Sequence, residues 1–272
     1  MAGTSAFTIT TIMPATLDLL VAIGMSAAAG LVGSIAVMRR MALASDALSH
    51  VALPGVALAL LLHVSPLVGG VVALVVGTFI VWALEYRTRI PTEAVIGVLF
   101  SAALAAGSLM ASGEDLLDAL LGTRGASRGL EAALGLVTAA LVIVFIVRAR
   151  SRLVIRLVSP DLAVTLGVSV ARLDLLYLLA FALTVALGLR YLGVLLMGSL
   201  IIIPATTAMY LARDLRAMEI IAVSSAVCST LVGSAIASRL NVATGPVIIV
   251  VAATIFVAAL LRRRPWRPRT AA

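Results

Sequence analysis

The stretch that decides the fold is MALASDALSHVALPGVALALLLHV, residues 41–64, an apolar run that contains one acid and one imidazole near its start. About 20 apolar residues cross the hydrocarbon core of a bilayer, so this run predicts a membrane-spanning helix. Asp46 and His50 are four residues apart, which places both side chains on one face of that helix, about 6 Å apart along its axis. Ionisable groups at membrane depth are costly and mark functional sites, so this pair is the leading candidate site.

The composition agrees with a membrane protein throughout the chain. Of the 272 residues, 62% are hydrophobic and 12% are charged, and the mean hydropathy is +1.21. A soluble domain has roughly half apolar and a quarter charged residues. We therefore interpret residues 1–272 as a single all-α polytopic transmembrane domain with about nine transmembrane helices. The expected spans are 17–38, 41–64, 67–84, 93–111, 130–147, 173–189, 192–211, 219–237 and 245–261.

The arginines predict the orientation of these spans. The sequence has no lysine, so the net charge of +8 comes from arginine. Arginine-bearing junctions follow every second span, at 39–40, 87–89, 148–156, 213–216 and 262–269. The positive-inside rule then predicts an external N-terminus and a cytoplasmic C-terminus. Because these charges mark span ends and form no basic groove, we expect no nucleic-acid partner.

The residues around Asp46 and His50 leave two interpretations open. Carboxylate and imidazole are ligands that zinc, manganese and iron accept, which favours a path for a divalent metal ion. The alternative is a structural hydrogen-bonded pair that holds the helix against a neighbour. His63, near the external end of the same helix, is either an entry ligand or a surface histidine. Without lysine the chain cannot contain the phosphate-binding motif G-x-x-x-x-G-K-[ST], so ATP-driven transport would need a separate motor subunit.

Residues 38–57, MRRMALASDALSHVALPGVA, closely resemble the second-helix signature of the membrane permease subunits of bacterial zinc, manganese and iron ABC importers. Ser45 stands where that family usually has glycine, and Thr206 where it usually has alanine. The resemblance continues in matching order over about residues 17–261. It is carried by EAVIGV at 93–98, SPDLAVTLGV at 159–168, and GVLL through IPATTA at 193–208.

The resemblance implies a fold similar to that of the cobalamin and siderophore importer permeases, with one fewer span. It also implies a homodimer in the bacterial inner membrane, an ATPase subunit, and an external solute-binding protein that delivers the metal. The cargo would be Mn²⁺, Zn²⁺ or Fe²⁺, with no permanently bound cofactor and no enzymatic activity in this chain. The wording of the second-helix motif leans toward manganese or iron, but ligand type permits all three metals.

Further residues acquire expected roles. In the resembling family the cytoplasmic turn after the seventh span couples to the ATPase. The resemblance gives this role to Pro204, Ala205, Thr206, Thr207, Arg213 and Asp214. The alternative is that these residues form a simple anchoring turn. The acidic stretch 112–129 is either a docking surface for the binding protein or a solvated loop, and its acids are Glu114, Asp115 and Asp118. Pro54-Gly55 is expected to break the second helix just beyond His50. Glu93 is expected at the start of the fourth span.

Two other classes of function remain at this point. A secondary carrier could use Asp46 and His50 as a proton relay and need no ATPase. An intramembrane enzyme could use them as catalytic groups, but no further acid and no serine or cysteine nucleophile is arranged with them in a catalytic pattern.

Overall fold

The protein is an all-helical bundle over the part of the chain that the computed structural model describes, residues 4–88, 90–110, 129–191 and 194–262. The helices are α1 (Thr4–Met38), α2 (Ala42–Leu61), α3 (Pro66–Arg87), α4 (Thr92–Met110), α6 (Gly129–Val158), α7 (Pro160–Thr165), α8 (Val170–Tyr191), α9 (Val194–Leu211), α10 (Leu215–Leu240) and α11 (Thr244–Arg262).

The predicted all-α polytopic class is confirmed. Within the described ranges, seven helices are long and apolar enough to cross a membrane, and α2 and α9 contribute the shorter apolar stretches Asp46–Leu61 and Met197–Leu211. Each predicted span overlaps one of these helices, although α2 ends three residues before the expected end at 64. Residues 111 and 192–193 of the predicted spans lie outside the described residues. The length and apolar character of the runs therefore located the helices correctly.

The expected break at Pro54-Gly55 is wrong, because α2 continues as one helix through Pro54 to Leu61. Proline removes the hydrogen bond to the carbonyl four residues earlier, here that of His50. The helix survives because neighbouring helices enclose it, with Leu53 and Val56 both buried. In a membrane such packing makes an internal proline tolerable.

The fifth span is longer than predicted. α6 runs to Val158, eleven residues beyond the expected end at 147, so the arginines of 148–156 lie on its final turns. Nothing in these residues stops a helix until Ser159, whose hydroxyl accepts a hydrogen bond from the Leu162 N–H and caps the next helix. The following Pro160 begins α7, as the sequence predicts.

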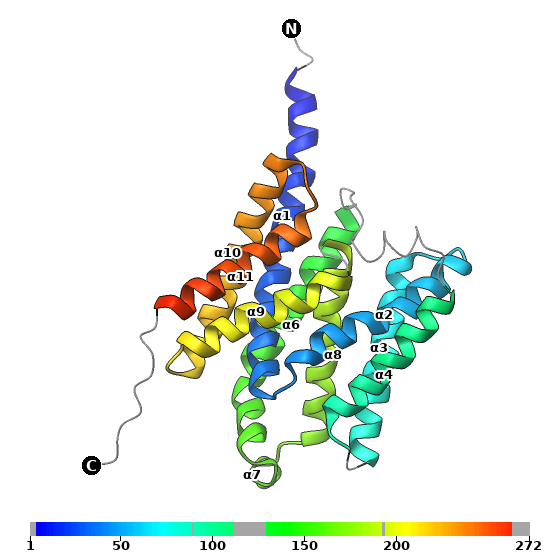
Figure 1. The fold of residues 1–272 in the computed structure, drawn as a ribbon, viewed down its shortest axis with the longest axis vertical. Coiled ribbons are helices and arrows are strands. Elements are labelled where there is room, and N and C mark those ends of the chain that lie inside the picture. The colour runs from blue at the N-terminus through cyan, green and yellow to red at the C-terminus, as the bar shows by residue number, and fades with distance from the viewer. Residues whose placement is uncertain (1–3, 89, 111–128, 192–193, 263–272) are drawn as a thin grey trace.

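α1 lies at the centre of one group of helices (Figure 1). α1 packs against α6, α8, α9 and α10, and α9, α10 and α11 pack against one another. α2, α3 and α4 form a second group, shown in blue to green on the right of Figure 1. α3 contacts α8 and α2 contacts α9, so these two helices join the second group to the rest of the bundle.

Glycines permit the closest of these helix contacts. A Cβ on Gly55 of α2 would collide with the carbonyl oxygen of Gly69 on α3, and a Cβ on Gly69 would collide with that of Gly55. The backbones of α2 and α3 are therefore in direct contact at this point. Small residues allow such approach where lipid provides no hydrophobic force between helices.

We expect Gly55→Ala to lower the melting temperature of the purified protein, because the added methyl group forces α2 and α3 apart. Gly97→Ala on α4 is the matched control, since a Cβ there meets nothing within 4 Å. Alanine is favoured over glycine inside a helix by about 1 kcal/mol, so the control should melt at the same or a higher temperature. Equal melting temperatures for the two variants would contradict the close contact.

Candidate functional site

Asp46 and His50 lie on consecutive turns of α2, at the level where α9 crosses it. Asp46 is exposed in the single chain and His50 is half-buried. Gly198 of α9 lies directly over the acid, because a Cβ on Gly198 would be 2.8 Å from the Cα atom of Asp46. The backbone of α9 therefore forms one wall beside the pair.

His50 is held by an aromatic contact from α4. Its ring meets the ring of Phe100 edge-on, with centroids 5.3 Å apart and an interplanar angle of 63°. The Nδ1 atom of His50 is buried and has no hydrogen-bond partner among the described residues. Buried polar atoms are nearly always paired, so an unpaired imidazole nitrogen beside a carboxylate fits a residue that receives a ligand.

Asp46 and His50 supply two side chains of the kinds that bind metal ions. The described residues contain no group of three or more His, Cys, Asp or Glu side chains that could hold a metal ion. Transition metals in proteins take about four to six ligands, more than these two side chains provide.

The structure does not bring His63 to this pair. His63 is exposed and has a left-handed backbone, with φ of 56°, just after the end of α2. It closes the helix, since the next N–H, that of Val64, donates to the Ala59 oxygen at 2.9 Å. Thirteen residues separate His63 from His50, which is about 20 Å along a helix.

Most of the residues expected to couple to the ATPase are enclosed in the bundle. Pro204, Ala205 and Thr207 are buried within α9, which passes through the proline without a break. The hydroxyls of Thr206 and Thr207 donate to carbonyl oxygens of their own helix, at 2.9 and 2.8 Å.

The remaining two coupling candidates, Arg213 and Asp214, are exposed in the short connection to α10, and Asp214 caps α10 by accepting from the Ala217 N–H at 2.8 Å. α9 and α10 are joined by a short turn, because Asp214 starts α10 three residues after α9 ends. Glu93 lies in the first turn of α4, as expected. Glu114, Asp115 and Asp118 lie outside the described residues.

Sequence reasoning missed a buried ionic cluster at the arginine-bearing end. The carboxylate of Asp174 on α8 accepts from Arg39 Nη2 at 2.6 Å and from Arg156 Nη2 at 2.8 Å. Glu85 of α3 lies 3.7 Å from the same Arg156. The side chains of Asp174 and Arg39 are only 3% and 6% exposed. Asp174 lies one residue inside the predicted span 173–189, and a buried acid must pair with a cation. Its position in the sequence could therefore have indicated this cluster.

Tyr177 extends this cluster into the core. The guanidinium carbon of Arg39 lies 4.8 Å from the centre of the Tyr177 ring, and the Tyr177 hydroxyl donates to the Val32 oxygen at 3.2 Å. Arginine above an aromatic face gains from the negative charge of the ring, more so when desolvated. The cluster thus ties α1, α3, α6 and α8 together at one end of the bundle.

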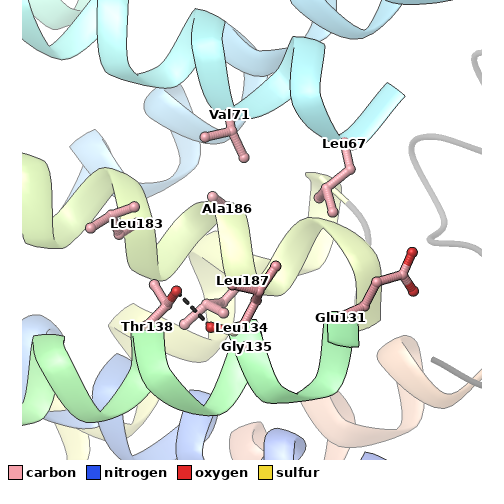
Figure 2. A pocket seen from close by; sticks show the side chains of 9 residues that line it. All are labelled: Leu67, Val71, Glu131, Leu134, Gly135, Thr138, Leu183, Ala186 and Leu187. Atoms are coloured by element: carbon pink, nitrogen blue, oxygen red, sulfur yellow. Dashed lines mark hydrogen bonds between the residues drawn. The ribbon is translucent and has the colours of Figure 1, made fainter. Parts of the chain in front are cut away.

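A cavity lies away from the acid–imidazole pair. It has a volume of about 210 Å³ and lies between α3, α6 and α8, lined by the side chains labelled in Figure 2. Glu131 lies at its edge with the carboxylate directed away from the apolar side chains, and the Thr138 hydroxyl donates to the Leu134 oxygen of its own helix. These walls are apolar and offer no cluster of metal ligands.

A polytopic helical bundle with ionisable side chains inside an apolar helix has the general form of a membrane transport protein. The chain belongs to the ABC 3 transport family, whose model matches residues 10–263.

Several known proteins are similar to the chain over most of its length. The high-affinity zinc uptake system membrane protein ZnuB of Haemophilus influenzae is 30% identical over 237 residues, which cover 85% of this chain and 90% of that protein. The manganese transport system membrane protein MntC of Halalkalibacterium halodurans is 28% identical, with 89% of this chain and 87% of that protein covered. A solved structure, PsaBC from Streptococcus pneumoniae in complex with a Fab, matches with a TM-score of 0.76 and 27% identity over 89% of each chain.

We expect Asp174→Asn to destabilise the protein strongly, because it leaves the buried Arg39 facing a neutral amide. Breaking a buried ion pair typically costs about 3–5 kcal/mol. Asp161→Asn is the matched control, since Asp161 is exposed on α7. Thermal unfolding of the two purified variants should separate them by several degrees, and a melting temperature of Asp174→Asn equal to that of the control would refute the structural role.

Proposed function

We propose that this chain is the permease subunit of an ATP-driven importer for divalent transition-metal ions, and that Asp46 and His50 contact the ion on its way through the membrane. The proposal is supported by family membership and by similarity to relatives named for zinc and for manganese. Because those two relatives are almost equally similar to the chain, the identity of the metal remains open.

The observation that carries the proposal is the exposure of Asp46 on an apolar helix of the single chain. A carboxylate facing lipid at membrane depth is too costly, so another chain or an aqueous path must cover it. A second copy of this chain would cover the carboxylate and would leave an aqueous path between the two copies. Two Asp46 and two His50 side chains around a twofold axis would present four donors to an ion.

Transport requires that these donors hold the ion weakly. A closed tetrahedral set of strong ligands would retain zinc, whereas conduction requires binding that is weak enough to be reversed. In an alternating-access cycle, movement of one copy against the other would bring the two pairs together and then separate them. α9 is suited to transmit that movement, because its backbone rests on α2 at Gly198.

ATP hydrolysis takes place in a separate subunit under this proposal, and α7 is its favoured docking point. α7 carries apolar side chains that are exposed, including Leu162, Val164 and, just beyond its end, Leu166. The Ser159 cap marks its start, and Gly167 with φ of 74° follows its end. α7 projects from the end of the bundle where α1 and α6 end, shown at the bottom of Figure 1.

The orientation that we propose places this end in the cytoplasm. The arginines of α1, α3, α6 and α11 lie at or just beyond the C-terminal ends of these helices, and the connection after α9 contains another. α1, α3 and α6 run downward in Figure 1, toward the end that carries α7. The N-terminus would then be external, on the side where a solute-binding protein delivers the ion and where the stretch with Glu114, Asp115 and Asp118 is expected.

Asp46→Ala and His50→Ala should each abolish metal uptake while the permease and its ATPase still assemble, because each removes one donor type from the shared site. His63→Ala is the control and should retain uptake within about twofold, since His63 lies about 20 Å further along the chain. The measurement is competitive uptake of Mn²⁺, Zn²⁺ and Fe²⁺ by cells carrying the complete transporter. Unchanged uptake in both site variants would overturn the site, and uptake that persists without an ATPase would favour a secondary carrier.

Val164→Glu should reduce copurification of the ATPase subunit, because it places a charge in the apolar surface of α7. The control is Val242→Glu, which changes another exposed valine, in the turn between α10 and α11 at the other end of the bundle. Both variants should keep the melting temperature of the isolated permease. If Val164→Glu retains the ATPase as well as the control does, α7 is not the docking point.

A further inference from the structure

A polar cavity of about 300 Å³ lies at the arginine-bearing end of the bundle, apart from the acid–imidazole pair. It is enclosed by the turn between α1 and α2, the end of α3, the start of α4 and the end of α6. Five charged side chains line it: Arg39, Arg40, Arg156, Glu85 and Glu93. A lining with both signs of charge sets this cavity apart from the apolar cavity between α3, α6 and α8.

Four charged groups in and beside this cavity already pair with one another. Arg39 and Arg156 share Asp174, and Arg156 also lies near Glu85, so these four groups balance one another. One donor of the buried Arg39 is left over, because its Nη1 has no hydrogen-bond partner among the described residues and its side chain is only 6% exposed. A buried guanidinium nitrogen without an acceptor is an unusual condition that favours a ligand with an oxygen at this wall.

Arg40 adds a second cationic group to the same wall. Its backbone is left-handed, with φ of 60°, and its N–H donates to the Val37 oxygen at 3.1 Å. The Met41 N–H donates to the Ala36 oxygen at 2.9 Å, which completes a hydrogen-bonded turn at the end of α1. This geometry fixes the position of Arg40 beside Arg39 even though arginine seldom adopts a positive φ.

The opposite wall carries a single acid. Glu93 is exposed in the first turn of α4, and neither it nor Arg40 forms an ion pair with another described residue. A simple anion in the cavity would meet Glu93, and a simple cation would meet the two arginines. A ligand with a phosphate at one end and an ammonium group at the other would complement both walls.

The position of the cavity indicates where such a ligand comes from. α1 and α3 end beside it and α4 begins beside it, so it lies at the level where the apolar stretches give way to polar residues. That is the headgroup level of a bilayer, where arginines meet lipid phosphates. Met41 and Leu157 supply apolar lining next to the charges, as a glycerol backbone and its first methylene groups require.

We propose that this cavity binds the headgroup of a phosphatidylethanolamine-type phospholipid, with the phosphate on Arg39 and Arg40 and the ammonium group on Glu93. The bound headgroup would link the α1–α2 turn to the start of α4. Asp46 lies only six residues beyond Arg40, so the lipid would set the position of the cytoplasmic half of α2. The proposal stands on the cavity alone and does not depend on the identity of the transported ion.

The test is lipid retention by the complete transporter, purified and measured by native mass spectrometry from bilayers of three lipids with identical acyl chains. Phosphatidylethanolamine should be retained most. Phosphatidylcholine has no ammonium N–H to donate to Glu93, and phosphatidylglycerol has no cation at all. Arg40→Gln and Glu93→Gln should each lower retention of phosphatidylethanolamine about two- to fivefold, the scale of one exposed charge contact.

Two further readouts distinguish recognition from general destabilisation. Glu93→Gln should raise retention of phosphatidylglycerol relative to phosphatidylethanolamine, because it removes the repulsion of an anion. Arg152→Gln, at an exposed arginine of α6 that does not line the cavity, should leave all three lipids unchanged. Equal retention of the three lipids, or unaltered retention in both cavity variants, would overturn the proposal. So would displacement of the lipid by soluble phosphoethanolamine at comparable concentration, which would identify a free zwitterion as the ligand.

Discussion

The arrangement of the bundle depends on one buried carboxylate. Asp174 accepts hydrogen bonds from Arg39 and Arg156, which come from the ends of two other helices. In a medium of low dielectric constant, any of these three side chains would be prohibitively costly if it were charged and unpaired. The three helix ends must therefore stay together. This constraint fixes the turn that leads into α2, and through it the position of Asp46 relative to the rest of the chain.

α2 combines requirements that conflict in a membrane. It has to be apolar enough to lie among lipid-facing helices, yet it carries an acid and an imidazole. Glycines on both sides resolve part of the conflict, since Gly55 allows contact with α3 and Gly198 allows α9 to lie over Asp46. What remains is an exposed carboxylate that the single chain leaves uncovered, and this is why we assign the completed site to two copies rather than one.

Local sequence predicted the existence of the helices far better than their ends. The break expected at Pro54 does not occur, because neighbouring helices hold α2 through the missing hydrogen bond. α6 continues beyond its predicted end, because we ended the predicted span where the apolar run meets its first arginine. The helix itself ends only before Ser159. α9 ends at Leu211, where the seventh span was expected to end, and the hydroxyls of Thr206 and Thr207 bond to carbonyl oxygens of their own helix.

The sequence by itself determined that the chain is a polytopic helical membrane protein, and it identified Asp46 and His50 as the pair to examine. Both conclusions follow from short-range facts, namely the length of an apolar run and a spacing of four residues. Only the tertiary structure decided which charges pair and that Phe100 holds His50. These contacts join residues from different helices, up to 135 positions apart for Arg39 and Asp174, and no local pattern specifies such pairings.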